Sequence, residues 1–352
     1  MAEDTTRPYD AVRRAAAWRD RSGEGRVEVS GGDLVSWLQG LLTNDVAALR
    51  PGQGCYAAYL TPQGRMVSDV RVLRFGGTCW LDLPAVAHDR VLNRLEMFVI
   101  TEDVTLRDLA GEVARVAVHG PSAPEAIGRA LAPAGAIALA ADLAALAEHH
   151  HLAADTDLGR VIVAAGRDLA VPGFDLYVAT ERKAGLVQRL VDSGLPEIDA
   201  GTWRTYRVEA GRPEYGVDMD EDTIPLEAGI EGRAISFTKG CYVGQEVIVR
   251  VRDRGHGRVA RRLVGLTGPQ AAIGEEAVVA AGDVLLDGER EVGRVTSAAV
   301  SPLVGRTIAL GYVHRDSTSE GRAVQARAAS GMVALTVTAL PFRRDDGPGG
   351  HA

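Results

Sequence analysis

The spacing of apolar positions changes along the chain, and each kind of spacing predicts a different element. Apolar residues recur at helical spacing over 34–42, directly after Asp33, which is the expected N-cap. Strands are predicted over 55–60 and 65–75, joined by a hairpin turn at 61–64, and over 78–83. A helix over 85–97 and a strand over 113–119 follow, so helices and strands are mixed from the start.

The middle of the chain is rich in alanine and is interrupted by Pro133 and Gly135. This predicts a helix, a break and a second helix over 123–151, ending in His149, His150 and His151. Adjacent residues on a helix point in different directions, so these histidines predict a polar helix end rather than a shared metal site. The next expected elements are strands over 161–165 and 174–179, helices over 181–193 and 203–210, and an acidic loop over 214–222.

From Leu263 onward the pattern becomes one of short strands between Gly, Asp and Pro turns, which predicts a small barrel or sandwich. The expected strands are 263–266, 278–280, 284–286, 291–298, 307–312 and 332–339. The predicted organisation is a flexible N-terminus over 1–25, with room for a short helix at 11–18, then an α+β region over 26–262 that we expect to form two interleaved lobes. A barrel domain over 263–342 and a flexible tail over 343–352 follow.

Composition narrows the class of protein. The 352 residues are 46% hydrophobic and 24% charged, as in soluble globular proteins, and the length favours two or three domains. No run of about 18 apolar residues is present and the first residues do not resemble a signal peptide, so no membrane contact and a cytoplasmic location are expected. The net charge of −8 makes direct nucleic-acid binding an unfavoured function.

A local basic stretch departs from this acidic balance. Six arginines occur between 250 and 262, at positions 250, 252, 254, 258, 261 and 262. Their guanidinium groups suit carboxylates or phosphates. A solvated edge balanced by neighbouring acids explains them equally well.

The cysteines lie at positions 55, 79 and 241, and this odd, widely spaced set predicts neither a disulfide framework nor a self-contained zinc or iron–sulfur site. Cys55 and Cys79 have strand-like surroundings and are expected to be buried. Cys241 lies in Lys239-Gly240-Cys241-Tyr242-Val243-Gly244-Gln245-Glu246. A nearby ammonium favours the reactive thiolate, and Gly240 leaves room beside the sulfur, so Cys241 is a candidate reactive thiol. The residues that follow fit either a helix, through Glu246 and Arg250, or a strand, through alternating valines.

Two carboxylates are further candidates. Asp69 comes just after the predicted hairpin turn, where it could face a bound amine or transfer a proton, or simply form the polar side of a strand. Glu227 lies in the segment 225–229 and could accept paired hydrogen bonds from the ring N–H and amino group of a pterin. Glu227 also fits the first turn of a helix. The upstream acids, Asp218, Asp220, Glu221 and Asp222, are expected in a solvated loop.

These clusters resemble, in order and spacing, the folate-binding YgfZ family, which is related to the glycine-cleavage T-protein. The segment 239–246 looks like the Lys-Gly-Cys-Tyr-x-Gly-Gln-Glu signature of that family, and 37–46, 207–216, 225–229, 293–297 and 308–312 also match, so the likeness spans about 28–342. The resemblance implies an α+β molecule of three lobes around a central channel that holds tetrahydrofolate. It also implies a role in assembling or repairing 4Fe-4S clusters, including those of tRNA-thiolating enzymes.

The resemblance also assigns residues. Activity would depend on Cys241, Glu227 would hold the pterin, and Asp69 would lie near the reacting folate nitrogens. Lys239, Tyr242 and Arg250 are expected to contribute to folate binding. No metal site is predicted, and the expected partners are folate and iron–sulfur client or assembly proteins.

Two functions remain open at this point. The first is folate-dependent iron–sulfur assembly through Cys241, since T-proteins have no cysteine in the corresponding segment. The alternative is a tetrahydrofolate-dependent aminomethyltransferase or demethylase centred on Asp69, which matches a T-protein carboxylate. Direct RNA binding is the weakest hypothesis, because the arginines are not interleaved with aromatic residues.

Overall fold

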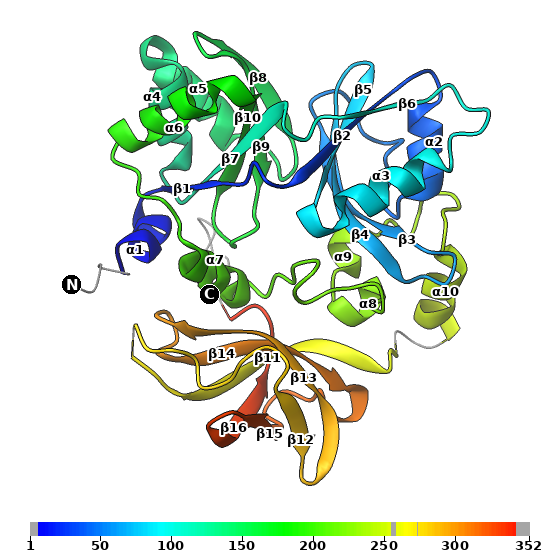
Figure 1. The fold of residues 1–352 in the computed structure, drawn as a ribbon, viewed down its shortest axis with the longest axis vertical. Helices are drawn as coiled ribbons and strands as arrows, with labels where there is room; N and C mark the ends of the chain where they lie inside the picture. Colours follow the sequence, from blue (N-terminus) through cyan, green and yellow to red (C-terminus); the bar gives the residue numbers. More distant parts are fainter. Residues whose placement is uncertain (1–5, 255–257, 273, 343–352) are drawn as a thin grey trace.

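A computed structural model of the chain describes residues 6–254, 258–272 and 274–342. Three lobes surround a common centre (Figure 1): two α+β lobes, each built on a five-stranded sheet, and a closed six-stranded barrel. The predicted α+β class and C-terminal barrel are therefore confirmed. Within the described ranges, no helix combines the length and apolar character needed to cross a bilayer.

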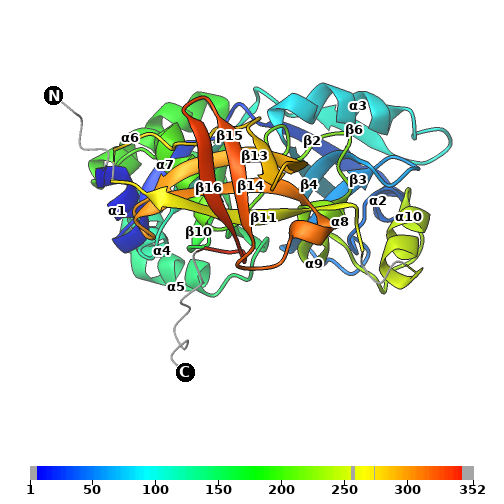
Figure 2. The same cartoon turned by 90° about the horizontal axis from the view of Figure 1, so that it is seen from below.

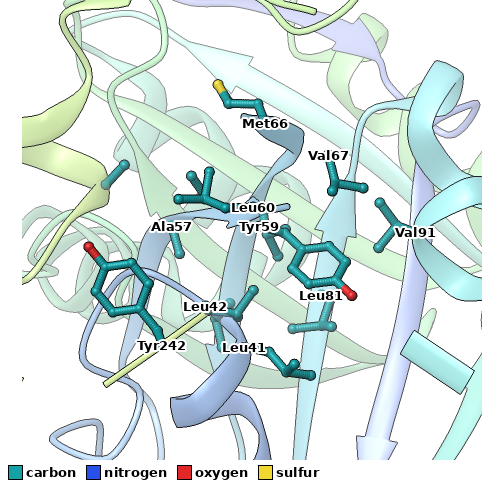
Figure 3. Packing of buried hydrophobic residues seen from close by; sticks show 14 of the residues in the cluster. Leu41, Leu42, Ala57, Tyr59, Leu60, Met66, Val67, Leu81, Val91 and Tyr242 are labelled. Carbon is teal, nitrogen blue, oxygen red and sulfur yellow. The ribbon is translucent and has the colours of Figure 1, made fainter. Parts of the chain in front are cut away.

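The first lobe is an antiparallel sheet in the order β3-β4-β5-β2-β6. Its strands are β2 (Gly25–Ser30), β3 (Gly54–Leu60), β4 (Met66–Arg74), β5 (Thr78–Leu83) and β6 (Thr105–Asp108). Two helices, α2 (Leu34–Leu41) and α3 (His88–Glu96), pack on it, and a 3-10 turn (Ala85–Ala87) precedes α3. Tyr59, Leu81 and Val91 lie in the shared core (Figure 3). Asp33 is not a side-chain cap as predicted, because its Oδ2 accepts a hydrogen bond from the backbone N of Asp103 at 2.8 Å.

The second lobe is an antiparallel sheet in the order β1-β7-β10-β9-β8. Its strands are β1 (Ala17–Asp20), β7 (Val113–His119), β8 (His151–Thr156), β9 (Gly159–Gly166) and β10 (Gly173–Ala179). Three helices cover one face (Figure 1): α4 (Ala123–Leu131), α5 (Ala136–Ala144) and α6 (Lys183–Asp192). The 3-10 turns Pro133–Gly135 and Thr180–Arg182 precede α5 and α6. His149 and His150 lie in the connection after α5 and His151 begins β8, so they do not end a helix as predicted.

The N-terminal segment is built into the second lobe, which corrects the expectation of a flexible segment over 1–25 for its described part. Residues 6–14 form α1 (Thr6–Arg14), and β1 pairs with β7. Tyr9 and Val12 of α1 are buried, three positions apart on one helix face. Because β1 belongs to the second sheet, all five strands of the first sheet are inserted between β1 and β7.

The barrel closes in the order β11-β14-β13-β12-β15-β16. Its strands are β11 (Arg261–Gln270), β12 (Val284–Asp287), β13 (Arg290–Ser301), β14 (Arg306–His314), β15 (Ala323–Ala328) and β16 (Gly331–Thr338), with a 3-10 turn at Arg315–Ser317. Residues 278–280 are not a strand, contrary to the prediction. Strand β15 was missed because alanine occupies half of its positions and is a weak strand former. The tail over 343–352 lies outside the described residues.

Four helices connect the second lobe to the barrel: α7 (Ala200–Glu209), α8 (Pro225–Ala228), α9 (Glu231–Ala234) and α10 (Gln245–Val249). Seen from below in Figure 2, α8, α9 and α10 lie on the side of the first lobe. A π-helical turn (Arg250–Arg254) continues α10, so the segment after Cys241 is helical and the strand alternative is wrong.

One acid of the predicted solvated loop is instead buried. Asp218 pairs with Arg207 of α7, and its Oδ1 accepts hydrogen bonds from Thr296 Oγ1 at 2.5 Å and Ser297 Oγ at 2.7 Å on the barrel strand β13. Arg207 also donates to Ser297 Oγ at 2.6 Å. This cluster attaches the barrel to the rest of the molecule. The acidic residues around 218 gave no sign of it, because the partners on β13 are far away in the sequence.

Candidate functional site

A cavity of about 310 Å³ lies where the two α+β lobes meet the segment 203–217. A volume of this size falls within the usual range for small-molecule sites, which often lie between domains. The lining includes Tyr56, Asp69, Val86, His149, Asp168, Trp203, Tyr215, Val217 and Arg233.

Asp69 on β4 lines this cavity. The Tyr56 hydroxyl donates to Asp69 Oδ2 at 2.8 Å, whereas Asp69 Oδ1 has no hydrogen-bond partner among the described residues. Burial raises the pKa of Asp69 to about 6, and the hydrogen bond from Tyr56 limits that rise. A carboxyl with this pKa can both hold and release a proton near neutral pH.

The register of the β3–β4 hairpin explains why Tyr56 meets Asp69. Ala58 of β3 lies opposite Asp69, so Tyr56, two residues earlier, is on the same face of the sheet as a diagonal neighbour. Tyr56 is not among the residues predicted from the sequence. The signal is the hairpin turn at 61–64, because pairing the two strands outward from this turn places Tyr56 on the same face as Asp69.

Buried ion pairs join the two lobes at this cavity. Arg71 of β4 pairs with Asp175 of β10, and Arg115 of β7 donates to both oxygens of Asp175, at 2.8 and 2.7 Å. Although burial alone would raise it, Arg115 and Arg71 hold the pKa of Asp175 well below its usual range. Tyr177 of β10 donates to Asp82 of β5 in the same region. The position of Asp69 relative to the second lobe is therefore fixed by charge pairing across the seam.

Flat rings and an apolar rim complete the cavity. The Arg233 guanidinium lies 5.0 Å from the Tyr56 ring centre, and the Arg21 guanidinium lies 4.8 Å from the Trp203 ring. Val86 and Val217, which are 70% and 51% exposed, also line it. The cavity thus combines aromatic surface, one carboxyl of raised pKa and exposed apolar groups, which fit a planar ligand that carries ring nitrogens.

The signature segment 239–246 lies outside this lining. Cys241 is exposed, whereas Cys55 and Cys79 are buried as predicted. Lys239 Nζ donates to the backbone oxygens of Gln39, Leu42 and Asn44, at 2.6, 2.5 and 3.0 Å. Burial lowers the pKa of Lys239 to about 8. The ammonium is therefore used to join the segment to the end of α2.

Two other residues of the segment are also used in packing. Tyr242 belongs to the core of the first lobe (Figure 3). Gly244 adopts a φ of +83°, and a Cβ there would lie 2.5 Å from the backbone oxygen of Thr61. Gly244 thus allows the segment to approach the hairpin turn. Gly240 has open space around it, which leaves the neighbouring thiol accessible.

The remaining predicted folate-binding residues are also away from the cavity lining. Glu227 on α8 accepts a hydrogen bond from Arg261 Nε at 3.1 Å, and its side chain is 12% exposed. Arg250 is exposed after α10. Asp69 is thus the predicted site residue that the structure places in the cavity, while Cys241, Glu227, Lys239, Tyr242 and Arg250 lie elsewhere.

The basic stretch is partly neutralised. Arg252, Arg261 and Arg262 each pair with an acid, which favours the interpretation of a solvated edge balanced by neighbouring acids for these three.

The described residues contain no group of three or more His, Cys, Asp or Glu side chains placed to hold a metal ion. The size of the cavity and its position between the lobes are those of an organic small-molecule site.

Comparison with known proteins identifies the family. Residues 1–239 match the GCVT N-terminal domain, and residues 261–343 match the glycine cleavage T-protein C-terminal barrel domain. The chain therefore belongs to the glycine cleavage T-protein family. The predicted T-protein relationship is confirmed, whereas the assignment to the YgfZ branch gains no support from these matches.

Individual relatives agree with this assignment. The chain is 34% identical over 345 residues to an aminomethyltransferase of Rubrobacter xylanophilus, covering 97% of this chain and 88% of the relative. It is 30% identical over 341 residues to an aminomethyltransferase of Bacillus subtilis, with 95% and 89% covered. The crystal structure of glycine cleavage system aminomethyltransferase T from Bartonella henselae superposes with a TM-score of 0.82 at 22% identity, covering 96% of this chain and 89% of that one. That structure shows the same fold.

Proposed function

We propose that this protein is a tetrahydrofolate-dependent aminomethyltransferase of the T-protein type, with Asp69 as its central carboxyl. The observation that carries the proposal is the state of Asp69. It lines the cavity, Tyr56 holds one of its oxygens, the other oxygen is unpaired, and its pKa is raised to about 6. The names of the full-length relatives support the same reaction.

The cavity fits a folate on chemical grounds. Tyr56 and Trp203 contribute aromatic side chains to the lining, and Asp69 Oδ1 offers a hydrogen-bond acceptor to a ring nitrogen. Bound tetrahydrofolate would supply the nitrogens that accept the one-carbon unit. The prediction that Glu227 holds the pterin remains untested, and in this structure Glu227 is paired with Arg261.

The residues of the chain would then act on protons. Asp69 in its ionised form accepts a proton from an amine, and in its neutral form donates one to a leaving amine, which aminomethyl transfer requires when ammonia departs. Tyr56 keeps the carboxyl in place by donating to Oδ2. Val86 and Val217 add apolar surface to the cavity lining.

A second candidate function rests on a separate observation. Cys241 is exposed and lies outside the cavity, so aminomethyl transfer at Asp69 makes no use of it. An accessible thiol with this position fits the folate-dependent iron–sulfur factor predicted from sequence, acting on a client protein. One cysteine supplies one ligand, so other donors would have to come from the client.

The proposal is tested by tetrahydrofolate binding and by ammonia release from an aminomethyl donor protein. Excess tetrahydrofolate is expected to raise the Tm of the wild-type protein, because it binds the folded state. Asp69→Asn should abolish ammonia release, whereas the exposed Asp222→Asn should leave it unchanged. No thermal shift with excess tetrahydrofolate would overturn both folate-dependent functions.

A further inference from the structure

His149 has an unusual backbone conformation. It lies in the connection between α5 and β8, and its φ is +66°, in the left-handed region. Ala170 is the other non-glycine residue with positive φ in the part of the chain that the structure describes. Glycine or asparagine adopts this conformation more easily than histidine, and such residues concentrate at functional sites. The imidazole must therefore be explained by what it contacts.

The ring of His149 lies at the cavity, stacked beside Tyr56. The two ring centres are 6.5 Å apart with an interplanar angle of 22°, and the side chain of His149 is 14% exposed. Tyr56 is the residue whose hydroxyl donates to Asp69. His149 therefore contacts the group that orients the central carboxyl.

A second contact to Tyr56 comes from Arg233, whose guanidinium lies over the Tyr56 ring. Arg233 Nη2 donates to Glu148 Oε1 at 3.0 Å, and His149 Nε2 is 3.7 Å from the same oxygen. Glu148 precedes His149 in the chain, so one carboxylate is paired with Arg233 and lies close to the neutral His149 ring. The arrangement encloses Tyr56 from both the second lobe and α9.

The backbone of this connection is fixed against the first lobe. The backbone N of His151 donates to the oxygen of Gly52 at 2.8 Å, and a Cβ at Gly54 would lie 2.6 Å from the oxygen of His149. The His149 backbone N donates to the oxygen of Ala165 at 2.9 Å in the second lobe. The imidazole is thus held at a set distance from β3, where Tyr56 lies.

We propose that His149 is a positioning residue for Asp69, acting through the ring and hydroxyl of Tyr56. Burial lowers the pKa of His149 to about 4, so the ring is neutral at physiological pH and acts by contact rather than by charge. The role of Asp69 toward folate rests on the proposed function. The geometric claim about His149, Tyr56 and Asp69 does not depend on the ligand.

The test uses His149→Gly and His149→Asn, because both replacement residues adopt a positive φ easily. Ala170→Gly is the matched control: it relieves the same backbone conformation without changing a residue that contacts Tyr56. The first readout is the Asp69 carboxyl titration followed by NMR in the ligand-free, full-length protein, assigned with Asp69→Asn. Tyr56→Phe removes a hydrogen bond that lowers the pKa of Asp69, so its midpoint should rise. Both His149 variants should move the midpoint in the same direction, without loss of Tm, and Ala170→Gly should not move it. Glu24 and Asp168, whose charges also act on Asp69, remain in every variant.

The second readout is tetrahydrofolate affinity. His149→Gly is expected to weaken binding by about 10-fold, the scale of one hydrogen bond, and to add little in the Tyr56→Phe background. An unchanged Asp69 midpoint in both His149 variants, or fully additive effects with Tyr56→Phe, would overturn the inference. A shifted midpoint in a protein that binds no tetrahydrofolate would leave the inference standing and overturn the proposed function instead.

Discussion

Arg71 of the first lobe and Asp175 of the second form a buried ion pair across the seam that borders the cavity. Arg71 Nη2 also donates to the backbone oxygen of Ala165 at 2.7 Å, and Asp175 receives Arg115 as well. A buried charge is tolerated when its hydrogen-bonding groups are satisfied, and this seam depends on several that are shared between lobes. The relative placement of the two lobes is therefore sensitive to single charge changes.

Asp175→Asn should lower the free energy of unfolding by about 3–5 kcal/mol, because it leaves Arg71 and Arg115 buried without their shared carboxylate. Urea denaturation at pH 7 measures the loss. The control is Asp157→Asn, which removes an exposed pair with Arg189 and should cost less than about 1 kcal/mol. Equal effects of the two substitutions would contradict this account of the seam.

Asp69 should make the free energy of unfolding depend on pH in the mildly acidic range. Its pKa is raised by burial from about 3.9 in the unfolded chain to about 6 in the folded protein. Between these values the folded state binds more protons, so the free energy of unfolding falls as pH rises through this window and levels off above it. Asp69→Asn removes the dependence.

The measurement is the difference in free energy of unfolding between wild-type protein and Asp69→Asn across pH 4.5 to 8. The variant should become relatively more stable as pH rises, while ammonia release is lost at every pH. A site that favours function over stability behaves in this way. A difference that stays constant across the window would show that Asp69 titrates normally.

Lys239 should behave as a structural residue. Lys239→Met leaves three backbone oxygens without their donor, and an unsatisfied buried polar group costs about 1–3 kcal/mol. We therefore expect a clear fall in Tm, measured by thermal denaturation. The tetrahydrofolate affinity of the folded fraction should remain close to that of the wild-type protein, because Lys239 is outside the cavity lining.

Cys241→Ser separates the two candidate functions. The thiol is exposed and Gly240 beside it has open space. The free energy of unfolding should therefore change by less than about 0.5 kcal/mol. Ammonia release should be unchanged if aminomethyl transfer is the function. A loss of 4Fe-4S enzyme activity in a deletion strain complemented with Cys241→Ser, with normal ammonia release, would instead support the iron–sulfur role.

Local patterns predicted the fold best where the element and its turn lie together in sequence. The β3–β4 hairpin and α2 were found because turn residues and helical spacing are short-range signals. Lys239 shows the opposite case. Its three acceptors lie 195 to 200 positions earlier. The sequence placed the Lys239 ammonium beside Cys241 because the two residues are close in the chain, whereas the structure places it on these backbone oxygens. Asp218 was misplaced for the same reason, since its partners on β13 are about 80 positions away.

The candidate site was predicted in part for a similar reason. Asp69 has a local signal, a carboxylate just after a turn, whereas His149 and Arg233 meet Tyr56 only after the lobes and α9 have packed together. Sequence spacing alone carries no information on contacts between residues this far apart in the chain.

The insertion of the first sheet between β1 and β7 sets an order of events during synthesis. Strand β1 leaves the ribosome early, but its partner β7 ends at His119. At about 5–20 residues per second, β1 waits roughly 5–20 s for that partner. The first lobe can complete its own sheet meanwhile, because none of its strands pairs with the second sheet. We therefore expect the nascent chain to present a complete first sheet beside a free strand, β1, onto which the second lobe closes. The cavity and the rest of the first core form later, when the residues up to Val259 have followed.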